Sequence, residues 1–324
     1  MEETRFENHS LPRNILIAID ASEHSFEAVR YVGRILPAER IRITLLHVLD
    51  PVPECFRDLE LPPCFQHKVV GHNSWESQQK AIIRDFMARA TSLLMDLGHP
   101  RESISVLTEE REMGIARDIA RKAKAGFDAL VVGRRGTSAI RDLILGSIAH
   151  KLVTHLTQTT VWVIGVRPDP TKILIGTDSS EGAGRALDYV WDIFGRAHPE
   201  ILLLHVAREL DFLQSGGERA ILSASSLELA REGLETAEVA MASFFDECIG
   251  RLEQRGADVS RIKTKIVQGV YSRALAIYGE AREEGYGTIV MGRRGLSRVE
   301  EFFMGRVSNK VLQMAGEMAV WIVH

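Results

Sequence analysis

The sequence predicts an α/β protein made of two tandem doubly wound domains, each a five-stranded parallel sheet of order 3-2-1-4-5 with helices on both faces. Three observations support this fold class. The chain repeats itself at an offset of about 159 residues: LLHV at 45–48 returns at 203–206, and VVGRRG at 131–136 returns as VMGRRG at 290–295. Short apolar runs alternate with helical stretches, which is typical of parallel sheets. The length of 324 residues fits two domains of ordinary size.

The expected strands of the first half are brief apolar runs bounded by charge, Gly or Pro. They cover residues 14–20, 41–48, 103–108, 128–132 and 160–166. Helices are expected where apolar residues recur every three or four positions, at 22–36, 76–97, 115–125 and 144–156. The second half repeats the scheme with strands at 172–178, 200–206, 260–267, 287–291 and 318–323. Residues 51–75 and 207–222 read as irregular stretches of the length that lids or contact surfaces often have.

The two halves meet at Arg167-Pro168-Asp169-Pro170, which predicts domains at 1–167 and 168–324. Its prolines fix φ and remove backbone donors, so this linker is short and leaves the halves little freedom. The last strand of each half is apolar and lies at a sheet edge in the expected order, where unpaired backbone groups invite another strand. The sequence therefore predicts that this edge of each half is open to a partner strand.

Bulk composition excludes several classes of partner. Forty basic against forty-four acidic residues give no field that would hold nucleic acid over a large surface. No segment approaches the ~20 apolar residues of a membrane span, and no export signal is apparent, so a cytoplasmic location is expected. Cys55 and Cys64 lie near His67 and His72, but the spacing is not that of a zinc knuckle, and we expect no metal site there.

Ligands of doubly wound sheets bind outside the carboxyl ends of the strands, where the strand order reverses. Strands one and four are neighbours at that point. Asp20 and Asp178 end the first strand of each half, and Gly133 and Gly292 end the fourth. The sequence therefore places an acidic residue and a glycine loop at one crevice in each half.

The glycine loop of the first half reads Gly133-Arg134-Arg135-Gly136, then nine residues, then Gly146-Ser147 at the start of a helix. Glycines let backbone N–H groups approach an anion, and a helix start offers free amides and the positive end of its dipole. Isolated turns of this kind are as often simple chain reversals. Here the same spacing recurs at Gly292, Gly295 and Gly305, again between a strand and a helix, which favours a phosphate cradle.

These motifs resemble those of the universal stress protein family, in a tandem form that covers almost the whole chain. The resemblance implies that ATP binds at this crevice, with Mg²⁺ accompanying it, that the strand-one Asp and a residue ending strand two lie near the adenosine, and that the glycine loop holds the phosphates. It also implies that the two halves pair through their last strands as an internal pseudo-dimer, with a homodimer of whole chains as a further possibility. The candidate binding residues it implies in the first half are Ala18, Ile19, Asp20, Val48, Val132, Gly133, Arg135, Gly136, Gly146 and Ser147. Those of the second half are Asp178, Val206, Gly292, Gly295, Gly305, Arg306 and Ser308.

The second half departs from the family pattern at Arg306, which stands where Ser or Thr follows the last glycine. Arg306 could pair with a phosphate, or its bulk could fill an emptied pocket. Two positions further on, the first half has Ala149 and the second has Ser308, so each half keeps one hydroxyl. The sequence leaves the competence of the second half open.

Several candidates have structural alternatives. Asp20 could be only a helix cap, a role that Ser22 could fill equally well. The loop arginines could be solvated charges, His47 and His205 are expected to be structural, and Trp162 and Trp321 are expected to pack in the core.

The sequence contains no GxxxxGK[ST] loop, GxSxG elbow, HExxH pair or kinase signature. We therefore expect an ATP-binding stress or regulatory protein that interacts with protein partners and has at most slow ATPase activity. The alternative is a nucleotide-free interaction scaffold with a vestigial site, especially in the second half. An AMP-forming enzyme is a weaker third hypothesis, because no separate substrate or catalytic residues support it.

Overall fold

The computed structural model describes residues 13–50, 70–136, 145–166, 168–169, 171–194, 199–208, 224–294 and 304–324. Cys55, Cys64, His67 and Gly295 lie outside these ranges, so the structure does not test what was inferred for them. Among the residues that it describes, no group of three potential ligands could hold a metal ion. None of the described helices is long and apolar enough to cross a membrane.

The first half alternates strands and helices along the chain. Its strands are β1 (Arg13–Ala18), β2 (Ile41–Leu49), β3 (Ile104–Glu110), β4 (Ala129–Gly133) and β5 (Thr160–Ile164). Its α-helices are α1 (Glu23–Ile35), α3 (Val70–Asp96), α4 (Ile115–Ala123) and α5 (Ser147–His155). Helix α3 begins earlier than predicted, so residues 70–75 are helical and not irregular; their polar sequence hides the start of the apolar repeat.

The second half repeats this alternation. Its strands are β6 (Lys172–Thr177), β7 (Glu200–Arg208), β8 (Ile262–Val270), β9 (Thr288–Gly292) and β10 (Ala319–Val323). Its α-helices are α6 (Glu181–Phe194), α8 (Ala224–Gln254), α9 (Arg273–Glu283) and α10 (Arg306–Met314). Strand β7 pairs with β8 as far as Arg208, so residues 207 and 208 belong to β7 and not to the predicted irregular stretch.

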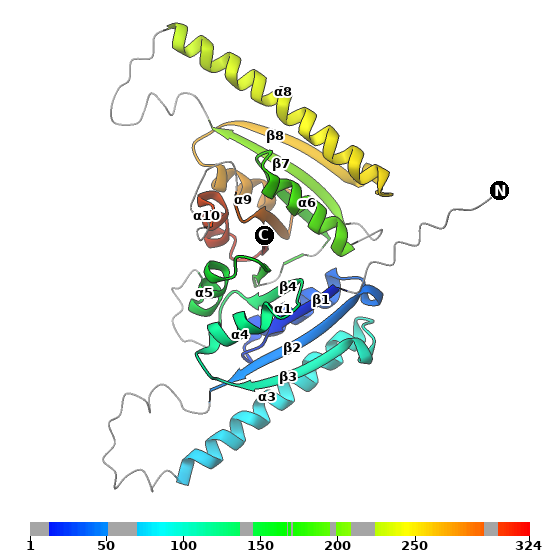
Figure 1. The fold of residues 1–324 in the computed structure, drawn as a ribbon, viewed down its shortest axis with the longest axis vertical. Helices are drawn as coiled ribbons and strands as arrows, with labels where there is room; N and C mark the ends of the chain where they lie inside the picture. The colour runs from blue at the N-terminus through cyan, green and yellow to red at the C-terminus, as the bar shows by residue number, and fades with distance from the viewer. Residues whose placement is uncertain are drawn as a thin grey trace, which may run out of the picture.

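The ten strands of the described residues form one sheet of order β3-β2-β1-β4-β5-β10-β9-β6-β7-β8. Each half contributes five parallel strands, and the halves join where β5 pairs antiparallel with β10. The expected pairing of the two last-strand edges is therefore present in the structure. Helices α1, α3, α6 and α8 pack on one face and α4, α5, α9 and α10 on the other, each face burying its own apolar core. The pseudo-symmetric arrangement of the two halves, with α3 and α8 outermost, is visible in Figure 1.

The junction between the halves is aromatic. Trp162 of β5 and Trp321 of β10 lie opposite each other in the strand pair, and their rings stack with centroids 3.7 Å apart and an interplanar angle of 2°. Tyr31 and Tyr189 meet both indoles edge-on. Burial raises the pKa of both phenols, which stay protonated, and Tyr31 hydrogen-bonds Thr288 of the other half at 2.7 Å. The packing role expected of the tryptophans is what the structure shows.

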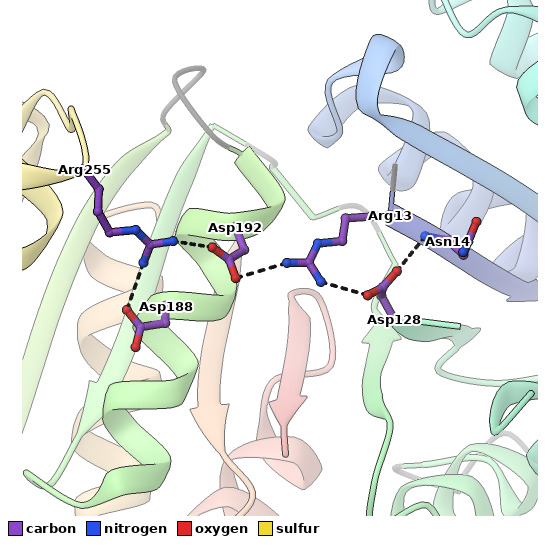
Figure 2. A network of polar contacts seen from close by, with 6 residues as sticks. All are labelled: Arg13, Asn14, Asp128, Asp188, Asp192 and Arg255. Atoms are coloured by element: carbon purple, nitrogen blue, oxygen red, sulfur yellow. Dashed lines mark hydrogen bonds and ion pairs between the residues drawn. The ribbon is translucent and has the colours of Figure 1, made fainter. Parts of the chain in front are cut away.

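An ion-pair network also bridges the halves (Figure 2). Arg13 at the start of β1 contacts Asp128 of its own half at 2.9 Å and Asp192 of α6 at 3.1 Å. Arg255, after α8, contacts Asp192 and also Asp188, at 3.2 Å for the latter. About a third of the Arg13 and Asp192 side chains is exposed, so solvent screens these charges.

We expect Arg13→Gln to lower the free energy of unfolding by only about 0.5–1 kcal/mol, because the lost ion pairs are partly exposed. Urea denaturation at low and high salt measures this, and the difference from wild type should shrink as salt rises. Lys263→Gln, which removes an ion pair with Glu200 inside the second half, is the control. A loss of unfolding free energy above ~2 kcal/mol that salt does not change would contradict the conclusion that solvent screens these ion pairs.

Candidate functional site

The crevice of the first half lies where β1 and β4 end side by side. Ala18, the last residue of β1, is paired with Val132, next to the last residue of β4. The chain then carries Asp20 toward the glycine loop: a Cβ added to Gly136 would lie 2.4 Å from Oδ2 of Asp20. The structure thus brings the predicted acidic residue and the predicted glycine loop together.

The turn after β1 and the equivalent turn after β6 are strained in the same way. Ala21 has a φ of 62° and Ser179 a φ of 58°, in the left-handed region that residues with a Cβ rarely adopt. This turn ends β1 at Ala18, two residues earlier than predicted, and places Asp20 and Asp178 in a loop. Sequence reasoning missed this strain because nothing in an Ala or Ser residue signals it.

Ser22, and not Asp20, caps helix α1. The Ser22 hydroxyl oxygen accepts the N–H of Ser25 at 3.1 Å. Asp20 instead holds this cap, because its Oδ1 accepts the N–H and the hydroxyl of Ser22 at 3.1 and 2.6 Å. Oδ1 of Asp20 is thereby fixed, while Oδ2 lies beside Gly136. Asp178 in the second half similarly accepts the N–H of Ser180 at 3.2 Å.

His47 positions the segment that carries Asp20. Its Nδ1 lies 2.7 Å from the carbonyl oxygen of Ile19, and Nδ1 of His205 lies 2.9 Å from that of Thr177. Because a carbonyl only accepts, Nδ1 must donate in both pairs. These are the structural roles expected of the two histidines.

Burial lowers the pKa of His47 below its ordinary value of 6.5, although Ile19 and Asp20 oppose the shift. The folded protein therefore binds this proton more weakly than the unfolded chain, and its stability falls as the pH drops below about 6.5. An NMR titration of the imidazole signals, with His47→Gln to assign the resonance, should find a midpoint below 6.5. A midpoint above that value would contradict the inferred burial effect.

The glycine loop of the first half depends on close backbone approach. A Cβ on Gly133 would lie 2.8 Å from the backbone of His24, so only glycine fits there. Gly146 then precedes α5, and no side chain caps this helix in the described part of the chain. Among the described residues, the first-turn amides of α5 therefore have no side-chain acceptor, which is the arrangement of an anion site. Ser147 is exposed at this start.

The two adjacent loop arginines point in different directions. Arg135 is exposed, whereas the Arg134 side chain is only 1% exposed. Arg135 is thus the one whose guanidinium a phosphate could reach. Sequence reasoning did not separate the two residues.

Four predicted apolar site residues have buried side chains: Ile19, Val48, Val132 and Val206. These residues can offer a ligand only their backbone groups. Ala18 is half-buried at the end of β1.

The second half resembles the first in outline but differs at the phosphate end. Gly305 precedes α10 without a side-chain cap in the described residues, and Arg306 is exposed at the first helical position, so its bulk does not fill a buried pocket. Ser308 is buried and donates its hydroxyl to the carbonyl oxygen of Gly292 at 2.9 Å. This bond places Ser308 in the packing of α10 against β9, which speaks against its predicted contact with a phosphate.

A carbonyl oxygen also approaches the start of α6 in the second half. A Cβ on Gly182 would lie 2.5 Å from the carbonyl oxygen of Arg294. His24 occupies the matching position in the first half, and its real Cβ excludes such an approach. The carbonyl oxygen of Arg294 therefore packs against the start of α6, a contact that the first half cannot make.

Comparison with known proteins places the sequence in a family. The sequence profile of the Universal stress protein family matches residues 12–164 and again 170–324, nearly the whole chain. The chain belongs to the Universal stress protein family. Its two-domain α/β fold, predicted from the repeat, is thereby confirmed.

Relatives of the same family cover the chain to different extents. A universal stress protein of Mycobacterium tuberculosis is 23% identical over 309 residues, 93% of each chain. One from Mycolicibacterium smegmatis is 26% identical over 196 residues, and this match spans less than two thirds of either chain: 59% of this one and 63% of that one. Among solved structures, a universal stress protein from Archaeoglobus fulgidus aligns with a TM-score of 0.57 at 18% identity, covering 96% of this chain and 97% of that one. This last match shows a shared fold.

Proposed function

We propose that this universal stress protein binds ATP in the crevice of its first half and acts as a nucleotide-dependent regulatory protein in a stress response. One observation carries the proposal: Gly136 lies against the carboxylate of Asp20 beside a helix start that no described side chain caps. An acidic group, a glycine loop and free helix amides together fit the two ends of a nucleotide.

The residues of the first half divide between these two ends. Oδ2 of Asp20 and the backbone around Ile19 and Val48 would hold the adenosine. The amides of Gly136 and Ser147, the Ser147 hydroxyl and the exposed guanidinium of Arg135 would hold the phosphates. Mg²⁺ would enter with the phosphates, because no cluster of protein ligands exists among the described residues.

We do not expect fast hydrolysis of ATP. The chain lacks the P-loop lysine and Ser/Thr pair that position phosphates and Mg²⁺ in fast ATPases. Nδ1 of His47, which positions the segment that carries Asp20, is engaged with a backbone carbonyl. Occupancy, and not turnover, would then be the signal, read by a protein partner through the ordered glycine loop.

We propose that the second half does not bind nucleotide and serves as a scaffold. The engaged hydroxyl of Ser308 and the presence of Arg306 where the first half has Ser147 both support this. A scaffold without any nucleotide is the alternative for the whole protein, and the arrangement around Asp20 and Gly136 argues against it.

Calorimetric titration of nucleotide-stripped protein with Mg-ATP tests the proposal. We expect about one equivalent bound per chain. Two equivalents would assign a phosphate contact to Arg306, and no binding would leave the scaffold as the better account. Turnover at ~1 per second or faster would contradict a binding role.

A further inference from the structure

The first arginine of each glycine loop reaches across the junction into the other half. Nη2 of Arg134 donates to the carbonyl oxygens of Leu312 and Gln313, each at 2.7 Å, and Nη1 donates to that of Ala315 at 3.2 Å. Leu312 and Gln313 lie in the last turn of α10, and Ala315 is its C-cap residue. Arg134 thus satisfies the carbonyl groups that a helix end leaves without partners.

Arg293 makes the same contacts in the opposite direction. Its Nη1 donates to the carbonyl oxygens of Val153 and Leu156 at 2.7 and 2.9 Å, and its Nη2 donates to that of Thr154 at 2.8 Å. These acceptors lie at the end of α5 and at its C-cap. Under the sequence repeat they match the three acceptors at the end of α10. The exchange of arginines is therefore symmetric.

Both guanidinium groups are buried, at 1% exposure for Arg134 and 4% for Arg293. Burial lowers the pKa of each, that of Arg134 to about 10, so both remain protonated near neutral pH. A buried cation needs compensation, and here it lies at the negative end of a helix dipole among several carbonyl oxygens. Each arginine consequently depends on the helix of the other half being in place.

The same two arginines also accept backbone hydrogen bonds within their own halves. We call these bonds, together with the side-chain contacts of Arg134 and Arg293, the circuit. The carbonyl oxygen of Arg134 accepts the N–H of Gly146 at 2.9 Å, directly before α5 begins. The carbonyl oxygen of Arg293 accepts the N–H of Gly305 at 2.8 Å, directly before α10 begins. Each arginine therefore fixes the start of the helix that follows its own glycine loop by its backbone, and the end of the equivalent helix of the other half by its side chain.

We propose that Arg134 and Arg293 are positioning residues that couple the two glycine loops, so that order in one loop is transmitted to the helix start beside the other. The loss of either side chain would loosen both loops, although each guanidinium is buried against the helix of the other half. The circuit exists in the free protein. Its response to ATP rests on the proposed function, in which the nucleotide orders the loop that contains Arg134.

Hydrogen exchange of the full chain without nucleotide tests the circuit. For Arg293→Met we expect exchange to accelerate about tenfold or more, by analogy with local opening of other helix ends, at residues 152–156 and also at 145–148, the opposite end of α5 beside the first glycine loop. Arg293→Lys keeps the charge but loses the paired donors, and should show a smaller change in the same segments. Arg13→Met, which removes a bridging arginine outside the circuit, should leave segment 145–148 unchanged.

A change confined to residues 152–156 in both Arg293 variants would overturn the proposal, and the lysine variant provides this reading if Arg293→Met does not fold.

Exchange in the presence of Mg-ATP distinguishes the arginine coupling from the proposed nucleotide binding. Protection of 133–148 and 312–316 in wild type, with the second lost in Arg134→Met, supports both. If the Arg293 variants change exchange at 145–148 but ATP protects no segment of wild type, the circuit is supported and the proposed function is rejected. If ATP protects wild type but the Arg293 variants leave 145–148 unchanged, the proposed function is supported and the circuit is rejected.

Discussion

Gly136→Val is expected to weaken Mg-ATP binding about a hundredfold or more, equivalent to ~2.7 kcal/mol of binding free energy. A Cβ at this position would lie 2.4 Å from Oδ2 of Asp20, so the valine must displace the carboxylate. The larger side chain also occupies the space that a phosphate needs beside the loop amides. One substitution therefore disturbs both ends of the proposed site.

The variant should still fold, because the displaced atom is the tip of a side chain and not backbone. Asp20 would lose its hydrogen bonds to Ser22, but Ser22 would keep capping α1 through Ser25. A thermal unfolding curve close to that of wild type checks this. Calorimetry then measures the binding loss on a folded protein.

The matched control lies at the same place in the sequence repeat. Gly295→Val changes the equivalent glycine of the second half, and we expect it to leave the affinity and the stoichiometry of about one unchanged. If Gly295→Val abolishes binding while Gly136→Val does not, the working site is in the second half. If both variants halve the stoichiometry, both halves bind nucleotide.

The repeat and the alternation of strands and helices were enough to predict the fold. Right-handed crossovers leave few orders for five parallel strands, and an apolar run at an outer edge indicates a partner strand. The pairing of Val161 to Val163 with Val320 to Ile322 follows from that pattern. Element ends were predicted less well: β1 stops at Ala18 because of the left-handed turn at Ala21, which the residue type does not announce.

The candidate site was predictable in its position but not in the direction of its side chains. Glycine spacing located the loop, since glycine is needed wherever backbone approaches closely, as Gly133 does to His24. The sequence Arg134-Arg135 says nothing about which guanidinium turns inward. That depends on carbonyl groups about 180 positions further along the chain, which only the assembled junction brings near.

Trp321→Ala is expected to lower the free energy of unfolding by about 3–5 kcal/mol, because it removes a large, fully buried ring from the centre of the molecule. The indole of Trp321 stacks on Trp162 and meets Tyr31 and Tyr189 edge-on, so all three lose contacts together. Equilibrium urea denaturation measures the loss. Trp321→Phe should recover part of it by refilling the site.

A double-mutant cycle with Trp162→Ala and Trp321→Ala isolates the contact between the halves. We expect a coupling of about 1 kcal/mol, since stacked aromatic rings contribute beyond the area that they bury. Trp191 of α6, which packs under the guanidinium of Arg255, provides the control: its replacement by alanine should be additive with Trp162→Ala. Because the two halves share one sheet and this aromatic cluster, wild type should unfold in one transition. Two separate transitions, or a coupling near zero, would show that the stacked indoles fill space without joining the halves.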